Sequence, residues 1–214
     1  MSARTPAALG FRMPAEWEPH EATWLAWPHE PADWPGKIAP IPWVYGEVVR
    51  HLARGEQVRI LVPDAVVEKK AKALLARVGV DRARVEWFRV PTDRSWTRDT
   101  CPLFVTDEAG CVAMTNWRFN GWAKYANHKK DDAINDKLVK RLKMTQWKPT
   151  VTVAGKPWRV VLEGGSVDVD GRGTILTTEE CLLSPVQARN PGMSRDEIER
   201  VLCDHLGARK VLWL

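Results

Sequence analysis

Two carboxylates stand beside strand-like segments, in the stretches SWTRDTCP and LEGGSVDV. Asp99 comes shortly after Trp96, and Glu163 is followed directly by Gly164 and Gly165. Carboxylates hold a planar guanidinium through two-point contacts, an indole face attracts a cation, and paired glycines permit a close backbone approach. These residue types therefore predict a pocket for a cationic ligand, and a guanidinium fits them best.

Each carboxylate also has a purely structural interpretation. Asp99 can form a local ion pair with Arg98 or an Asx turn with Thr100. Glu163 can cap a neighbouring backbone group at a bulge. Taken one at a time, each residue favours the structural interpretation. Taken together, two carboxylates at equivalent points of the chain favour a shared ligand site.

Hydrophobic spacing predicts the elements that must position these residues. Helices are expected over residues 43–53, 65–78 and 131–144, and a fourth runs from Ser194 as N-cap to Gly207 as C-cap. Glu197 completes a capping box with Ser194. Strands are expected in the segments TWLAW, VRILV, VEWFRV, PLFVT, CVAMTNW, WRVVLEGGSVDV, TILTTEECLL and KVLWL. This alternation indicates an α/β fold.

A strand–strand–helix–strand order recurs along the chain. The strand after helix 65–78 leads to Asp99, and the strand after helix 131–144 leads to Glu163. KVLWL follows the fourth helix in the same way. We therefore expect repeated modules, with an apolar edge strand at KVLWL that favours self-association.

The composition is that of an ordinary globular chain. Among its 214 residues there is no apolar run of about 18, so no membrane partner is expected, and MSARTPAALGF lacks a secretion-signal core. A net charge of +5 and twelve tryptophans would suit a nucleic-acid binder, but acidic residues are interspersed, so no nucleic acid is expected either. Four cysteines without CxxC pairs predict a reduced, cytoplasmic protein.

Missing motifs exclude several chemistries. The sequence has no GxGxxG, P-loop or GxSxG motif. Its five histidines show no HExxH pattern and no cysteine partner, so a zinc site is not expected. The DVDG stretch at 168–171 begins like a calcium loop but lacks the later ligands, which predicts a hairpin turn. We therefore expect no cofactor and no metal.

Six segments carry a family resemblance, and they occur in the order FRMPAEWEPHEATWLAWP, SWTRDTCPLFV, FNGWAKY, LEGGSVDVDGRGTILTTEECLL, RNPGMSRDEIE and KVLWL. Together they closely resemble the agmatine deiminase and bacterial peptidylarginine deiminase family, over nearly the whole chain. The resemblance implies the guanidine-modifying (pentein) fold, an α/β propeller of five repeated ββαβ modules. It also implies conversion of agmatine to N-carbamoylputrescine and ammonia, a step of putrescine and polyamine metabolism.

The mechanism that the resemblance implies uses a cysteine thiolate, which attacks the guanidinium carbon. A histidine assists the loss of ammonia, and water then releases the ureido product. The resemblance assigns Asp99 and Glu163 as the catalytic carboxylates that hold the guanidinium nitrogens, and Glu163 would also orient the histidine. Trp96 and Gly164 would bind the substrate, which makes agmatine, a small guanidinium compound, the implied partner.

The chain departs from the family in its nucleophile and base. The family's histidine and cysteine lie in motifs beyond the segment that matches KVLWL, and neither motif occurs in this sequence. Cys101 stands where the family usually has glycine, so packing in a turn is expected for it. Cys111, Cys181 and Cys203 are expected in the core.

We therefore predict a single deiminase domain over residues 1–214, truncated at its C-terminal side, with about three of five modules. On its own this chain is predicted to be inactive. Two alternatives stay open, namely a deiminase of peptidylarginine or another guanidine, and a non-catalytic guanidine-binding remnant. A homo-oligomer is compatible with either.

Overall fold

The structure, a computed structural model, describes residues 5–153 and 155–214, so part of the segment used above to judge a secretion signal lies outside the described residues. The chain forms two compact units. Unit 1 comprises residues 5–18, 98–126 and 135–214, and unit 2 comprises residues 19–97 and 127–134. In the described part of the chain, no helix is both long and apolar enough to cross a membrane.

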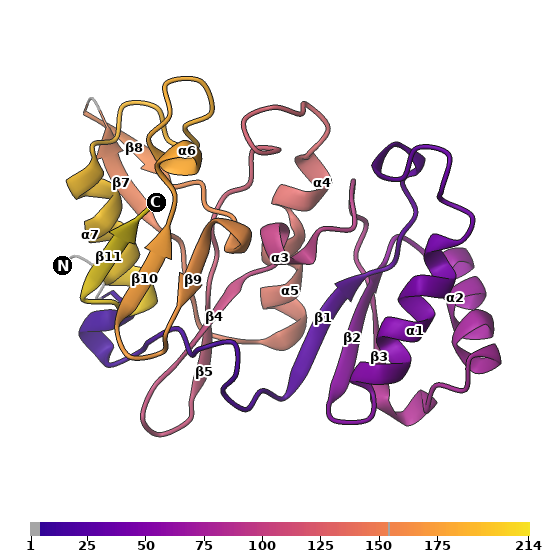
Figure 1. Ribbon diagram of the computed structural model, residues 1–214. Helices are drawn as coiled ribbons and strands as arrows, with labels where there is room; N and C mark the ends of the chain where they lie inside the picture. The colour runs from indigo at the N-terminus through magenta and orange to yellow at the C-terminus, as the bar shows by residue number, and fades with distance from the viewer. Residues whose placement is uncertain (1–4, 154) are drawn as a thin grey trace. The chain divides into compact units, whose positions relative to one another are not determined.

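Unit 2 is built on a parallel three-stranded sheet with the strand order β1-β2-β3. Its elements are β1 (Ala22–Ala26), α1 (Ile41–Leu52), β2 (Gln57–Val62), α2 (Ala65–Arg77), β3 (Val85–Arg89), α4 (Lys129–Asp132) and the 3-10 turns Pro31–Asp33 and Arg82–Arg84. Figure 1 shows α1 and α2 side by side next to this sheet. A parallel strand needs a crossover connection, and the two helices supply it.

The sheet and helices of unit 2 enclose one hydrophobic core. Its most buried members are Val49, Val58, Ile60, Val62, Ala71 and Leu75. Helix α2 begins where Asp64 accepts hydrogen bonds from the backbone N–H groups of Val66 and Val67, at 2.8 and 2.9 Å. A cap of this kind stabilises a helix by about 1 kcal/mol.

Unit 1 contains two modules with the same topology. The first consists of β4 (Leu103–Thr106), β5 (Val112–Thr115), α5 (Ile134–Leu142) and β6 (Gln146–Trp147). The second consists of β9 (Val167–Val169), β10 (Thr174–Thr177), α6 (Glu179–Leu182), α7 (Arg195–Leu206) and β11 (Lys210–Trp213). In each module the first two strands pair antiparallel and the third adds parallel. This is the strand–strand–helix–strand order expected from the sequence.

The remaining elements of the chain are short. They are the 3-10 turns Ala7–Leu9 and Gly164–Ser166, the helical turn α3 (Thr97–Thr100), and the hairpin strands β7 (Thr150–Val153) and β8 (Lys156–Arg159). The core of unit 1 includes Val105, Ala113, Trp117, Leu162, Ile175, Leu182 and Leu202. The predicted capping box of Ser194 and Glu197 is confirmed, and so is the left-handed C-cap Gly207, with φ of 70°.

Three predicted elements were wrong in extent. The helix predicted over 131–144 is divided into α4, which ends at Asp132, and α5, which begins at Ile134. Between them Ala133 donates its N–H to the carbonyl of Lys130 at 3.2 Å, which closes a tighter turn than an α-helix has. The strand predicted through TILTTEECLL ends at Thr177, because Thr178 caps α6 by accepting from the N–H of Cys181 at 3.3 Å. The long strand predicted over 158–169 is interrupted between β8 and β9 by the turn that carries Glu163.

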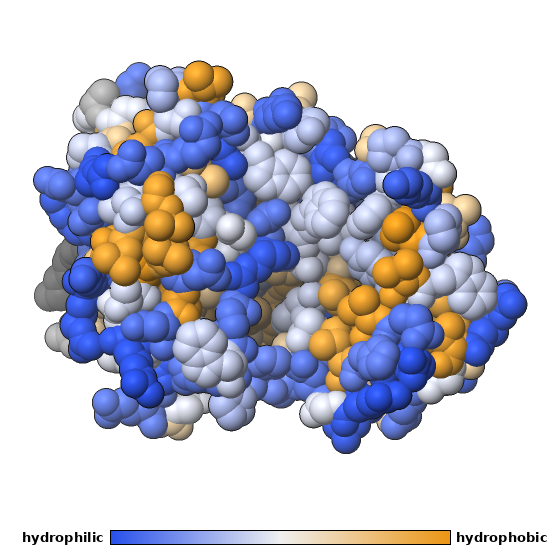
Figure 2. All heavy atoms as spheres, viewed as in Figure 1, coloured by the Kyte–Doolittle hydropathy of each residue, from blue (hydrophilic) through white to orange (hydrophobic). Residues whose placement is uncertain are grey.

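Hydrophobic side chains also lie on the surface. Trp43, Val44 and Val48 on α1 are 41%, 53% and 41% exposed, and Leu212 on β11 is 40% exposed. Figure 2 shows hydrophobic surface over both elements. Within the described part of the chain, β11 pairs on one side with β10 and on its other side with no strand, which is the apolar edge expected from KVLWL.

Candidate functional site

Asp99 and Glu163 occupy equivalent places in the two modules of unit 1. Asp99 lies in the helical turn α3, four residues before β4 begins at Leu103. Glu163 opens the 3-10 turn 164–166, four residues before β9 begins at Val167. Each carboxylate is therefore delivered by the turn that leads into the first strand of its module.

The Asp99 carboxylate contacts the turn of the second module. Its Oδ1 accepts a hydrogen bond from the backbone N–H of Gly165 at 3.2 Å, and the side chain of Trp122 donates a further one. Arg98 is directed elsewhere, because its Nε donates to the carbonyl of Gly164 at 2.9 Å and its guanidinium pairs with Glu16. Arg98 therefore pairs with Glu16, and the local ion pair between Arg98 and Asp99 is not the arrangement observed among the described residues.

Gly164 and Gly165 allow this close approach. A Cβ on Gly165 would collide with Oδ1 of Asp99, and a Cβ on Gly164 would collide with the carbonyl of Arg98 and lie 2.9 Å from Cδ2 of Leu103. Neither glycine has a positive φ. Space beside Asp99 requires glycine at position 165, and space beside the Arg98 carbonyl requires it at position 164; neither position needs an unusual dihedral.

Glu163 is held in a buried ion pair that sequence reasoning missed. Its side chain is 2% exposed, and Nε of Arg189 donates to Oε1 at 2.8 Å and to Oε2 at 3.1 Å. The carbonyl of Glu163 accepts from the backbone N–H and the hydroxyl of Ser166, at 3.0 and 2.7 Å. The turn and the carboxylate are thus both fixed.

Trp122 is the second residue that sequence reasoning missed. It lies in a turn where Gly121, Trp122 and Ala123 have positive φ of 67°, 60° and 57°. Such values are uncommon for a non-glycine residue, and Asn120 supports the turn by accepting from the N–H of Ala123 at 2.9 Å. The segments FNGWAKY and RNPGMSRDEIE contain Trp122 and Arg189, so their presence in recognisable motifs was the available signal.

Burial governs the electrostatics of the two carboxylates. Desolvation raises the pKa of Asp99, against hydrogen bonds from Gly165 and Trp122 that lower it. Desolvation likewise raises the pKa of Glu163, the charge of Arg189 opposes the rise, and the charge of Asp99 adds to it. The negative charge of Asp99 therefore disfavours ionisation of Glu163, and a cation placed against both carboxylates would favour their ionised forms.

Trp96 belongs to unit 2, where its ring centroid lies 5.4 Å from that of Trp34. Its neighbours are anchored in the same unit, since the hydroxyl of Ser95 donates to the carbonyl of Trp27 and that of Thr97 donates to the carbonyl of Trp24, at 3.4 and 3.1 Å. Of the four predicted site residues, the structure brings together Asp99, Glu163 and Gly164 within unit 1.

The cysteines show a mixed outcome. Cys181 packs half-buried against the core of unit 1, and Cys101 and Cys203 are also half-buried. Burial raises the pKa of the Cys203 thiol, which disfavours a reactive thiolate. Cys111 was wrongly expected in the core: it is exposed, in the turn before β5. Among the described residues, no three His, Cys, Asp or Glu side chains cluster as a metal site would require.

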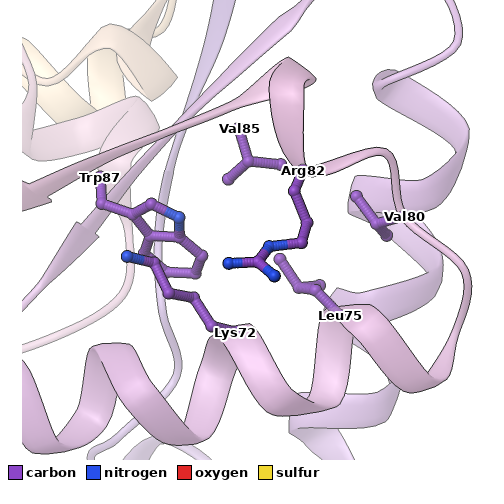
Figure 3. A pocket seen from close by; sticks show the side chains of 6 residues that line it. All are labelled: Lys72, Leu75, Val80, Arg82, Val85 and Trp87. Carbon is purple, nitrogen blue, oxygen red and sulfur yellow. The ribbon is translucent and has the colours of Figure 1, made fainter.

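A separate cavity of about 220 Å³ lies in unit 2. It is lined by Lys72, Leu75, Val80, Arg82, Val85 and Trp87. Figure 3 shows Lys72 and Arg82 reaching toward Trp87, and the Lys72 ammonium lies 5.4 Å from the centre of that ring. Two cationic side chains disfavour a guanidinium there, so this cavity is a poor alternative to the carboxylate pair.

Comparison with known proteins now defines the class. Residues 12–214 match the model of the Porphyromonas-type peptidyl-arginine deiminases, and the chain belongs to that family. Among its relatives, the agmatine deiminase of Pseudomonas aeruginosa strain LESB58 is 38% identical over 98% of this chain, and that of Stutzerimonas stutzeri is 37% identical over 98%. The chain spans 54% of the length of either relative, about half.

Solved structures agree with this assignment. The agmatine deiminase of Enterococcus faecalis superposes with a TM-score of 0.85 at 32% identity, and the match covers 100% of this chain and 55% of that one. A putative peptidyl-arginine deiminase superposes with a TM-score of 0.76 at 30% identity, over 96% of this chain and 57% of that one. The α/β class expected from the sequence is confirmed.

Proposed function

We propose that this protein is an agmatine deiminase-type hydrolase that converts agmatine and water to N-carbamoylputrescine and ammonia. The observation that carries the proposal is that Asp99 and Glu163 meet at one glycine turn. The N–H of Gly165 donates a hydrogen bond to Asp99, and Glu163 is buried beside this contact. Relatives and solved structures that bear the name agmatine deiminase support the choice of substrate.

In this function Asp99 and Glu163 are the catalytic carboxylates. Each accepts N–H groups of the substrate guanidinium and fixes its plane, which presents the central carbon for attack. Gly164 admits the substrate close to the backbone, and Glu163 also orients the family's histidine. Trp96 is a further substrate-binding residue that the family resemblance implies. The partial burial of Asp99 and near-complete burial of Glu163 strengthen these contacts, because water competes less there.

We propose further that residues 1–214 form part of a single pentein domain and supply about three of its five modules. The two ββαβ modules of unit 1 and the roughly half-length match to relatives support this. We place the protein in the cytoplasm, with no nucleic-acid or membrane partner. Since the family's histidine and cysteine motifs do not occur in these residues, the 214-residue chain alone binds agmatine without turning it over.

Titration calorimetry of the 214-residue chain with agmatine tests the binding site. We expect Asp99→Asn and Glu163→Gln each to weaken binding by at least about tenfold, which is 1.4 kcal/mol. Glu180→Gln, which alters an exposed carboxylate in α6, is the matched control and should bind like the parent chain. Binding that is equal in all four proteins would overturn the proposed site.

Two further assays test the reaction and the substrate. Ammonia release from agmatine above a no-protein control, abolished by Asp99→Ala, would refute the inactivity of the isolated chain. The family model is named for peptidyl-arginine deiminases, so a peptidyl-arginine substrate is the second candidate. Tighter binding of an acetylated arginine amide than of agmatine would favour that candidate.

A further inference from the structure

Arg189 shares a buried ion pair with Glu163 that no step of the proposed reaction requires. The Arg189 side chain is 5% exposed and the Glu163 side chain 2%. One donor, Nε, bridges both carboxylate oxygens at 2.8 and 3.1 Å. A carboxylate has about four acceptor positions, so this contact leaves others for a ligand.

Arg189 is anchored independently of Glu163. Its Nη1 donates to the carbonyl of Gln187 at 2.7 Å, and its own carbonyl accepts from Nδ2 of Asn120 at 3.4 Å. The next residue, Asn190, clamps the strand-like segment before Glu163, because its side chain accepts from the N–H and donates to the carbonyl of Val161, both at 2.8 Å. The loop that carries Arg189 is thereby fixed against the chain that carries Glu163.

Keeping both carboxylates ionised requires a resident cation here. Asp99 and Glu163 would place two negative charges in a largely dehydrated site, and a buried charge without a partner is costly. Arg189 supplies one positive charge permanently. A guanidinium ligand then supplies the second, so the site with both carboxylates ionised is neutral when one such group is bound.

We infer that Arg189 is a positioning residue of this site, which holds the buried Glu163 carboxylate in one orientation and ionised while leaving it able to accept from a substrate guanidinium. This inference rests on the proposed function for its substrate, but the ion pair itself does not. The hydrogen bond from the Arg189 guanidinium to the carbonyl of Gln187 argues against a plug that the substrate displaces, since a displaced guanidinium would have to abandon that contact as well.

Carbon-13 NMR of the ligand-free chain, labelled at the glutamate carboxyl, tests the ion pair without any substrate. The Glu163 signal is assigned by its loss in Glu163→Gln. We expect the pKa of Glu163 to rise in Arg189→Met, where the opposing charge is gone, and to rise less in Arg189→Lys. Arg195→Met, which removes an exposed arginine of α7, is the control and should leave that pKa unchanged. An unchanged Glu163 titration in Arg189→Met would overturn the inference.

Agmatine titration of the same proteins distinguishes two roles of Arg189, namely positioning Glu163 and blocking the site as a plug that the substrate must displace. Positioning predicts binding at least tenfold weaker in Arg189→Met, partly restored in Arg189→Lys, and unchanged in Arg195→Met. Equal or tighter binding in Arg189→Met would refute it and identify a plug. If the parent chain itself fails to bind agmatine, the proposed function fails, while the NMR titration still decides the role of Arg189. Should Arg189→Met not fold, Arg189→Lys carries both measurements, and parent-like values in both would overturn the inference.

Discussion

The backbone N–H of Gly165 donates to Oδ1 of Asp99 at 3.2 Å and joins two segments that lie 66 residues apart in the sequence. Asp99 precedes the first strand of one module, and Gly165 precedes the first strand of the next. This hydrogen bond therefore brings corresponding turns of two repeated units together, with Glu163 buried next to it.

Gly165→Ala tests the space beside Asp99. An added Cβ would collide with Oδ1 of Asp99 although the backbone of Gly165 suits alanine. We expect the unfolding free energy to fall by about 1–3 kcal/mol and agmatine binding to weaken roughly tenfold, measured by urea unfolding and calorimetry. Gly55→Ala is the control, because a Cβ added at Gly55 would lie 4.0 Å from its nearest neighbour, the carbonyl oxygen of Leu52. Parent-like agmatine binding in Gly165→Ala would contradict the steric role.

Asn190→Asp tests the clamp on Val161. The aspartate cannot donate to the Val161 carbonyl, and it places a charge where the side chain is 3% exposed. We expect the unfolding free energy to fall by about 2–4 kcal/mol, seen as a lower urea midpoint by tryptophan fluorescence. Asn127→Asp, at an exposed position, should change it far less. Equal midpoints for the two variants would rule out the clamp as a source of stability.

Asp131 predicts a pH dependence of the stability of unit 2. Burial raises its pKa to about 6 from 3.8, and the negative charge of Asp93 adds to the rise. Hydrogen bonds from the backbone N–H groups of Asp93 and Arg94 oppose the rise, as does the charge of His29. A raised acid pKa means that the folded state binds the proton more tightly. The stability it contributes is therefore present below pH 4 and is lost as the pH rises to about 6.

Urea unfolding at several pH values checks this expectation. Between pH 4 and pH 7 the parent chain should lose about 2 kcal/mol relative to Asp131→Asn, which has no proton to lose. Glu108→Gln, at an exposed position between β4 and β5, should track the parent at every pH. A constant difference between the parent and Asp131→Asn across this range would show that Asp131 does not titrate as described.

The open side of β11 predicts self-association of the 214-residue chain. Leu212 is 40% exposed on this edge strand, and unpaired strand edges with apolar side chains pair with other chains. Sedimentation velocity should show association that grows with concentration, and Leu212→Lys should reduce it. Val186→Lys, at an 83% exposed position away from the strands, is the control. A monodisperse parent monomer at high concentration would disprove the expectation.

Local patterns predicted much of this structure because their causes are local. The Ser194 capping box and Gly207 follow from residues within one helix, and the repeated strand order placed Asp99 and Glu163 at equivalent turns. Arg189 and Trp122 could not be assigned in this way. Arg189 meets Glu163 across 26 residues through the Asn190 clamp, and Trp122 reaches Asp99 from a left-handed turn. Neither spacing nor hydropathy encodes such contacts.

The separation of these partners along the chain also orders their assembly in time. A ribosome adds about 5–20 residues per second, so Asp99 is made several seconds before Gly165, which lies 66 positions later in the chain. Arg189, the ion-pair partner of Glu163, lies 26 positions further along the chain and is made later still. During synthesis, neither of these two contacts can therefore form until synthesis has reached the second module.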